Sequence, residues 1–359
     1  MQDLIDSQYA YTDWANAKVL SLCTGLSDAQ LDRSKEMGFG TLRATLFHIL
    51  AADTIWLERW QGQPWRPFPT DPAGMSLTAI ADGLHAVSAA RSEFVKQERD
   101  SGWLRIVEFR DSKQNLYQLQ LRDLLLHVCH HGVHHRAQAL NYLKQFERKL
   151  AGGVDYIFYR LAQGALTQSP EAVASMSQHG LAVNERLGPS VAWDAELVAR
   201  QFEYSDWANE KLLAVASTLD DAQLDRSFDI GQGSLRKILL HIYSAERWWA
   251  TNWTTGASPF PRMPETTSIA ELSELWHGLA IERNQFFDGL DDNAAHRVIE
   301  LSFSGPALRF PIVDTVIQLT MHGTHHRAQV VNLLRQVGSP SGNIDLLYAL
   351  VELSPPKKS

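Results

Sequence analysis

Histidine is the residue type in this chain whose spacing points most directly to chemistry. His131 and His135 lie four residues apart in the segment HGVHHRAQ, and His322 and His326 lie four apart in HGTHHRAQ. Residues four apart project from the same face of a helix, so each pair can present two imidazoles to one point. Imidazole nitrogens bind a divalent cation such as zinc at about 2.0–2.1 Å. Each segment therefore predicts two ligands of a metal site.

A third histidine precedes each pair in a segment of similar sequence, His48 in GTLRATLFHI and His241 in GSLRKILLHI. Three neutral histidines leave one position of a tetrahedral ion open, an arrangement typical of catalytic rather than structural zinc. We therefore predict one divalent metal ion in each half of the chain. The predicted ligands are His48, His131 and His135 in one site and His241, His322 and His326 in the other.

Two alternatives to this ligand assignment remain open on the sequence alone. The histidines could be hydrogen-bonded core residues, although their repetition in one pattern disfavours that interpretation. His131 could also pair with His134 instead of His135. On a helix, His134 and its counterpart His325 point about 100° away from the neighbouring ligand, so we expect them to contact the ligands, a substrate or another helix.

The sequence gives little support for a catalytic nucleophile or for a nucleotide-binding motif. His127 aligns with Gln318, so it is not required by a site that both halves share. Cys129 aligns with Thr320, which excludes a nucleophilic cysteine common to both halves. The sequence holds no GxSxG nucleophile motif and no glycine-rich nucleotide-binding pattern. No side chain is identified as a general base, and His134 and His325 are the weak candidates.

The histidine segments belong to an internal duplication. YTDWAN at 11–16 recurs as YSDWAN at 204–209, an offset of 193, and HGVHHRAQ recurs at an offset of 191. Matches in the same order indicate a duplicated domain rather than a solenoid, which needs more repeats. We expect one copy over 1–164, a linker over 165–190 and the second copy over 191–355.

Apolar periodicity predicts mainly helices. Glycine followed by Thr41 or Ser234 marks a helix start, because these hydroxyls cap the first backbone N–H groups. Each copy is expected to end with a short apolar helix that contains Asp155 or Asp345. The expected helices cover 2–23, 41–60, 76–100 and 122–146, with counterparts at 234–253, 268–289 and 313–336, and short hairpins fall at 104–121 and 298–310. The fold class is therefore all-α, two tandem four-helix bundles each with a short β-hairpin.

Charged residues repeated between the copies suggest contacts within each bundle. Arg136 is expected to pair with Asp13, and Arg327 with Asp206, tying the last long helix to the first; anion binding is the alternative. The tryptophans of both copies are expected to fill the cores; the alternative is that they line a substrate cleft. They are Trp14, Trp56, Trp60, Trp207, Trp249 and Trp253.

Two further matched positions lie close to the histidines. Asp53 and Glu246 follow the upstream histidine by five residues, about 140° around a helix, so we expect salt bridges there rather than ligands. Gly132 and Gly323 stand inside the histidine segments, where glycine costs about 1 kcal/mol relative to alanine. Their repetition predicts the close approach of another backbone segment or of a ligand.

Composition limits the classes of function. The chain has 359 residues, a formal net charge of −8 and 45% apolar residues, which favours folded domains and disfavours nucleic acid or anionic membranes as partners. It has no long apolar run and no pattern typical of a secretory signal, and it has only two cysteines, Cys23 and Cys129. We therefore expect a cytoplasmic protein with no membrane partner.

The combination of YxDWAN, GxLRxxLxHI and HGxHHRAQxxNxL resembles the DinB-like (DinB/YfiT) superfamily of metal-binding four-helix bundles. The resemblance covers nearly the whole chain, once per copy. It implies one histidine on the second helix and an HxxxH pair on a later helix as ligands of zinc, nickel or a similar ion. The superfamily name reflects expression induced by DNA damage rather than chemistry on DNA, which implies a link to stress responses.

The resemblance also implies a range of activities. Members include thiol-dependent S-transferases, a glutathione-dependent isomerase and hydrolases. The leading hypothesis is a metal-dependent enzyme that hydrolyses a small electrophile or transfers a low-molecular-weight thiol to it. The alternative is a metal-loaded module that binds a small ligand or a protein without catalysis. Because members pair as dimers, we expect the two bundles to form a pseudo-two-fold pair within one monomer, or the chain to form a homodimer.

Overall fold

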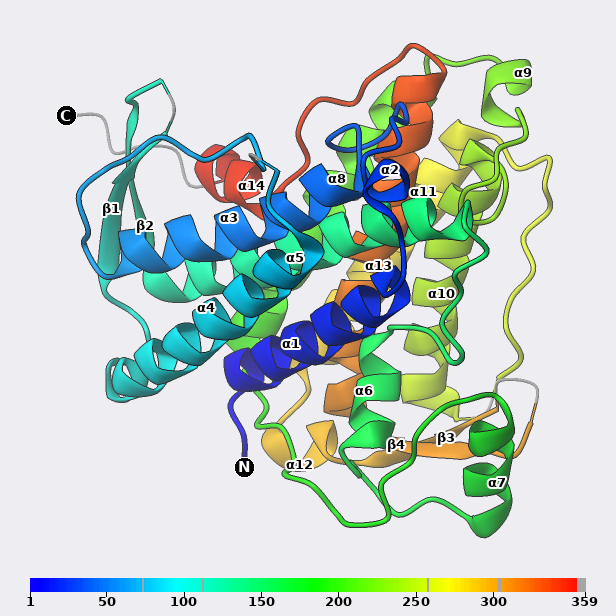
Figure 1. The fold of residues 1–359 in the computed structure, drawn as a ribbon. Coiled ribbons are helices and arrows are strands. Elements are labelled where there is room, and N and C mark those ends of the chain that lie inside the picture. Colours follow the sequence, from blue (N-terminus) through cyan, green and yellow to red (C-terminus); the bar gives the residue numbers. More distant parts are fainter. Residues whose placement is uncertain (73, 112, 257, 303–304, 354–359) are drawn as a thin grey trace. The chain divides into compact units, whose positions relative to one another are not determined.

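The structure is a computed structural model that describes residues 1–72, 74–111, 113–256, 258–302 and 305–353 (Figure 1). Among these residues, helices dominate and the strands form only two short hairpins. The elements of the first sequence copy are α1 (Leu4–Cys23), α2 (Asp28–Leu31), α3 (Leu42–Trp60), α4 (Leu77–Gln97), a 3₁₀ turn η1 (Arg99–Ser101), β1 (Ile106–Arg110), β2 (Leu116–Gln120), α5 (Leu121–Lys144) and α6 (Tyr156–Ala162).

The second copy repeats this order after the short helix α7 (Pro170–Gln178), which lies in the expected linker. Its elements are α8 (Ala195–Ala216), α9 (Asp221–Leu224), α10 (Leu235–Thr255), α11 (Ile269–Asp288), α12 (Asp292–Ala295), β3 (Val298–Leu301), β4 (Leu308–Pro311), α13 (Ile312–Gln336) and α14 (Leu346–Leu353). The predicted all-α class with two small hairpins is confirmed. Both hairpins are antiparallel, with Ile106 opposite Gln120 and Val298 opposite Pro311.

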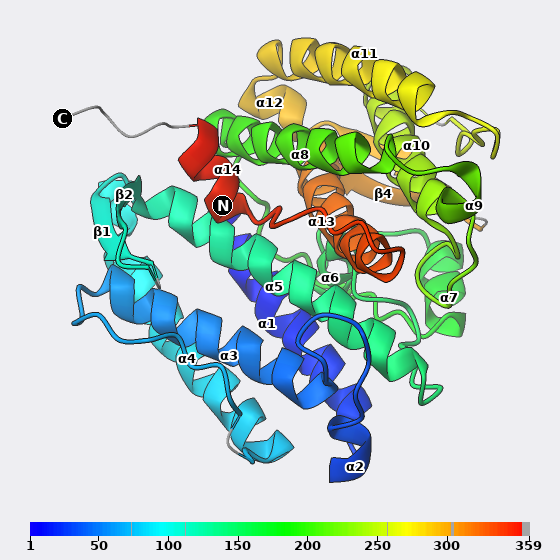
Figure 2. The same cartoon turned by 90° about the horizontal axis from the view of Figure 1, so that it is seen from above.

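The chain divides into two compact units, and each holds one helical bundle. The first unit contains Gln8–Lys149 and residues from Asn343 onward, and the second contains Met1–Ser7 and Leu150–Gly342. In the first unit α3 packs against α4 and α5, and in the second α13 packs against α8 and α10 while α11 covers α8 and α10. Figure 2 shows the long helices α1, α3, α4 and α5 of the first unit running alongside one another.

The last short helix of each sequence copy lies in the unit of the other copy. Helix α6 packs against α13, and α14 packs against α5 (Figure 1). Both helices bury apolar side chains, among them Ile157 and Leu161 of α6 and Leu350 of α14. Their aspartates do not lie inside the helices as expected: Asp155 is the N-cap residue of α6, and Asp345 directly precedes α14.

The predicted helix starts and the predicted core are largely confirmed. The hydroxyl of Thr41 accepts a hydrogen bond from the backbone N–H of Ala44, and that of Ser234 accepts one from Lys237. Both side chains thereby satisfy a backbone group that has no partner within the helix. The tryptophans of α3, α8 and α10 are buried, whereas Trp14 is half-buried.

A buried arginine, which the sequence did not single out, ties three helices together in each unit. Arg91 of α4 donates to Asp53 of α3 at 2.7 Å and to Asp13 of α1 at 2.5 Å, and its side chain is fully buried. Ser88 donates to the other oxygen of Asp13. The expected pair of Arg136 with Asp13 is therefore wrong, because other donors occupy that carboxylate.

The second unit repeats the arrangement with Arg283 of α11. Its guanidinium donates to both oxygens of Asp206, at 3.1 and 2.6 Å, and to Glu246. The expected pair of Arg327 with Asp206 is likewise wrong. The role of Asp53 and Glu246 as salt-bridge partners is confirmed. Spacing within helices cannot reveal such a partner, because it depends on which face of a third helix turns inward.

No helix among the described residues is both long enough and apolar enough to cross a membrane.

Replacing Arg91 by methionine should destabilise the first unit strongly. The change leaves the carboxylate of Asp53 buried without its counterion, which costs about 3–5 kcal/mol in comparable cases. Arg66→Met is the control, because Arg66 and Glu58 form a half-exposed pair that contributes about 0–1 kcal/mol. Urea unfolding followed by circular dichroism measures both, and equal losses in the two variants would contradict the bridging role of Arg91.

Candidate metal centre

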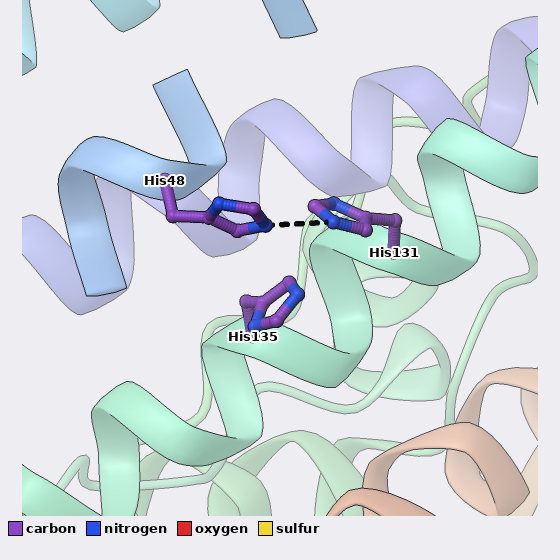
Figure 3. Close-up of side chains that lie close together, drawn as sticks. All are labelled: His48, His131 and His135. Atoms are coloured by element: carbon purple, nitrogen blue, oxygen red, sulfur yellow. Dashed lines mark hydrogen bonds between the residues drawn. The ribbon is translucent and has the colours of Figure 1, made fainter. Parts of the chain in front are cut away.

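The first histidine group forms where α3 and α5 pack together (Figure 3). His48 extends from α3, and His131 and His135 extend from successive turns of α5. The Nε2 atoms of His48 and His131 lie 3.0 Å apart, and one ring nitrogen from each of the three residues lies within 4.8 Å of the others. His131 and His135 are buried and His48 is half-buried, so solvent reaches the group from the α3 side.

The second group has the same construction in the other unit. His241 extends from α10, and His322 and His326 extend from α13. The Nε2 atoms of His241 and His322 lie 3.2 Å apart, and the three residues again offer ring nitrogens within 4.8 Å of one another. Here His241 and His322 are half-buried and His326 is buried.

The geometry of both groups fits a divalent ion. Two nitrogens that are each about 2.0–2.1 Å from a tetrahedral ion lie roughly 3.3 Å apart. The observed Nε2 separations of 3.0 and 3.2 Å are close to that value. These are the two groups of potential metal ligands among the described residues, and both can hold a metal ion. His134 is absent from the first group, so the geometry favours His131 with His135.

The environment lowers the pKa of five of these six imidazoles and so favours the neutral form that metal ligation requires. Burial, and to a smaller extent the neighbouring imidazoles, lower the pKa of His48 to about 2 and that of His241 to about 4. Burial likewise places the pKa of His131 and of His326 well below the usual value. A protonated imidazole would lose its hydration here and face other imidazoles, so the lone pairs remain available at neutral pH.

A glutamine orients the last histidine of each group. Gln138 Oε1 accepts a hydrogen bond from Nδ1 of His135 at 2.9 Å, and Gln138 Nε2 donates to Nε2 of His134 at 3.1 Å. Holding the proton on Nδ1 leaves Nε2 of His135 with a lone pair directed at the group. Gln329 makes the same two contacts with His326 and His325, at 2.8 and 3.2 Å.

This glutamine lies against a glycine in a left-handed conformation. A Cβ on Gly38, whose φ is +50°, would come within 2.6 Å of Gln138 Oε1, and one on Gly231, whose φ is +51°, would come within 2.3 Å of Gln329 Oε1. Only glycine therefore allows the loop to approach the amide so closely. The sequence prediction missed the glutamines, although both follow their histidine by three residues.

A carboxylate orients His322 by a hydrogen bond to its Nδ1 atom. Asp155 Oδ2 accepts hydrogen bonds from Nδ1 of His322 at 3.2 Å and from Nε2 of Gln318 at 3.1 Å. Burial raises the pKa of Asp155, but the hydrogen bonds from His322 and Gln318 outweigh it and place the net pKa below the usual value. In the first unit, Asp345 Oδ1 lies 3.2 Å from Nδ1 of His127, the residue that replaces Gln318.

The glycines inside the histidine segments make room for an arginine. A Cβ on Gly132 would lie 2.8 Å from a guanidinium nitrogen of Arg136, and one on Gly323 would lie 2.9 Å from the same atom of Arg327. Arg136 folds back along α5 and donates to Asn16 of α1 at 3.1 Å. A group does approach each glycine closely, but it is the arginine of the same segment and not the backbone or ligand that was expected.

The structure therefore belongs to the class of four-helix-bundle proteins with histidine groups that can bind a divalent metal ion. The sequence model of the DinB family matches residues 1–165 and 195–355, and the chain is a member of the DinB family in a tandem form. No curated protein sequence and no solved structure matches the chain.

Purified protein should bind about two divalent ions per chain. His131→Ala should remove one ion and His322→Ala the other, because each leaves only two nitrogens in its group. His127→Ala is the control, since its ring lies outside the three-nitrogen group of the first unit. Elemental analysis after dialysis counts the ions, and a full complement in His131→Ala would contradict the assignment.

The stability of the metal-free protein should fall as the pH drops below about 6.5. Histidines of the unfolded chain take up protons there, whereas the lowered pKa of His48 and His241 keeps these side chains neutral in the folded state. The unfolded state then binds more protons, which costs up to about 1.4 kcal/mol per pH unit for each such group. Denaturation in chelator at pH 7, 6 and 5 measures how steeply the free energy of unfolding falls with pH. His241→Leu should make this dependence less steep. An unchanged dependence in that variant would contradict the lowered pKa of His241.

Proposed function

We propose that this protein is a metal-dependent enzyme that hydrolyses a small electrophilic substrate or transfers a low-molecular-weight thiol to it. The observation that supports the proposal is the convergence of three imidazoles at one point in each unit, with at least one of the three side chains only half-buried. Neither group includes a carboxylate or a thiolate. An ion held by neutral ligands keeps its full positive charge and lowers the pKa of a water or thiol at its open position.

The donor set suits zinc or nickel. Imidazole nitrogen is a ligand of intermediate softness that binds zinc, copper, iron and nickel, whereas magnesium and calcium prefer oxygen. The hydrogen bonds of Gln138 to His135 and of Asp155 to His322 hold these imidazoles in the tautomer that ligation requires. The chain therefore supplies an oriented site rather than a flexible cluster of histidines.

Aromatic rings border the first centre. Phe39 stacks on the imidazole of His48 with ring centroids 3.9 Å apart, and Phe68 lies 5.1 Å from the same ring. Phe39 leaves 45% of its surface exposed. A substrate that approaches the centre over this ring meets an apolar wall, which suits an electrophile with an apolar or aromatic portion.

The second centre keeps part of this wall. Phe260, in the Pro-Phe-Pro segment that matches 67–69, stacks over His241 with centroids 6.0 Å apart. Phe39 corresponds to Gln232 in the second copy. The second centre therefore has no aromatic ring at the position where Phe39 stacks on His48. We propose that both centres are active and that they differ in the apolar groups they accept.

His134 and His325 are the side chains best placed to move a proton. The ring of His134 lies 4.9 Å from that of His135, and Gln138 bonds to both. Because Gln138 donates to Nε2 of His134, the neutral imidazole of His134 carries its proton on Nδ1. We propose this pair as proton carriers, the chain as cytoplasmic, and its partners as small molecules rather than nucleic acid or membranes.

A panel of thiols with small electrophiles, and the electrophiles alone, tests the activity. Chelator should abolish turnover, and readdition of zinc or nickel should restore it. His48→Ala and His241→Ala should each remove the turnover of one centre, and the double variant should lose at least 100-fold. His85→Ala, which changes an exposed histidine of α4, is the control.

Turnover that survives chelation and the double variant would contradict the enzymatic proposal. Tight binding of a panel compound without turnover would favour the alternative, a metal-loaded binding module.

A further inference from the structure

Asp155 contacts a metal-site histidine of the other sequence copy. By sequence it belongs to the first family match, 1–165, whereas His322 belongs to the second, 195–355. Its carboxylate oxygen Oδ2 nevertheless accepts hydrogen bonds from His322 and Gln318, both on α13. This contact exists because α6 is part of the second unit.

Helix α6 is firmly anchored beside α13. The backbone N–H of Ile157 donates to Gln318 Oε1 at 3.0 Å, and Arg160 forms a fully buried ion pair with Asp314 at 2.9 Å. The hydroxyls of Tyr156 and Ser7 lie 2.7 Å apart. Several anchors on one short helix hold its first turn, and with it Asp155, at a defined distance from His322.

The carboxylate of Asp155 does not cap its own helix. Asp155 occupies the N-cap position of α6, yet its side chain accepts no hydrogen bond from that helix. The N-cap residues Ser169 of α7 and Asp194 of α8 do accept one from the first turn of their helices. The oxygen that would ordinarily satisfy the helix end is directed to His322 instead.

The first unit receives a carboxylate from the second copy in the same way. Asp345 directly precedes α14, which packs against α5, and its Oδ1 lies 3.2 Å from Nδ1 of His127. His127 is one helical turn before His131 and stands where the second copy has Gln318. The two carboxylates thus take equivalent positions, but Asp155 bonds to a ligand histidine and Asp345 lies beside the preceding residue of the same face.

We propose that Asp155, which belongs to the first sequence copy, is the positioning residue of His322 in the metal site of the second copy. By accepting the Nδ1 proton, Asp155 fixes the tautomer and ring orientation of His322 and increases the basicity of its Nε2. The second copy by itself then lacks one residue of its metal-binding module. The proposal concerns metal binding and holds whether or not the centres catalyse a reaction.

The test uses the full chain with one site disabled. In a His131→Ala parent, which keeps only the second site, Asp155→Ala should weaken Zn²⁺ binding about 10- to 100-fold, as measured by competition with a chromophoric chelator. Asp155→Asn keeps the shape of the side chain and a neutral acceptor. Its Zn²⁺ affinity should therefore lie between that of the parent and that of Asp155→Ala. The Co²⁺ absorption spectrum and the Nδ1–H proton resonance of His322 should change with the affinity.

Two controls separate positioning from general stability. Ser7→Ala removes the hydroxyl partner of Tyr156 without touching His322, and Asp345→Ala removes the other exchanged carboxylate; both should keep the Zn²⁺ affinity of the parent within about twofold. Equal affinity in Asp155→Ala and the parent would overturn the proposal, and so would equal losses in Asp155→Ala and Asp345→Ala. A parent that binds no Zn²⁺ would overturn the metal site itself.

Discussion

The central constraint on this structure is that three imidazoles must stay neutral and direct their Nε2 atoms at one point. Neutrality follows from burial: a protonated ring between α3 and α5, or between α10 and α13, would lose hydration and meet other imidazoles. Orientation follows from acceptors on Nδ1, provided by Gln138, Gln329 and Asp155.

The buried charges behind the site serve the same constraint. Arg91 holds α1, α3 and α4 together through Asp13 and Asp53, and Arg283 does so in the other unit. A buried ion pair is weak support for stability in itself, but losing one partner is costly. These arginines therefore restrict the relative positions of the helices that carry His48 and His241, and a one-residue shift would separate the ring nitrogens.

Duplication has preserved the interior of the site more strictly than its rim. The histidines, the orienting glutamines and the glycine that faces each glutamine occur in both copies. The aromatic residue at position 39, which is partly exposed, does not. Ligands can change little because three atoms must meet at one point, whereas a side chain at the rim contacts only what approaches from solvent.

The sequence by itself determined the local elements and the histidine groups. The i,i+4 pairs, the caps Thr41 and Ser234 and the alternating hairpin strands depend on neighbours along the chain, so period and residue type were sufficient. The partner of Asp13 was predicted wrongly as Arg136, although Arg91-x-x-Phe94 recurs as Arg283-x-x-Phe286. Only the tertiary structure decided that partner, and only it assigned α6 to α13 and α14 to α5. A short apolar helix requires an apolar surface to cover, and its sequence does not specify which of two similar surfaces that will be.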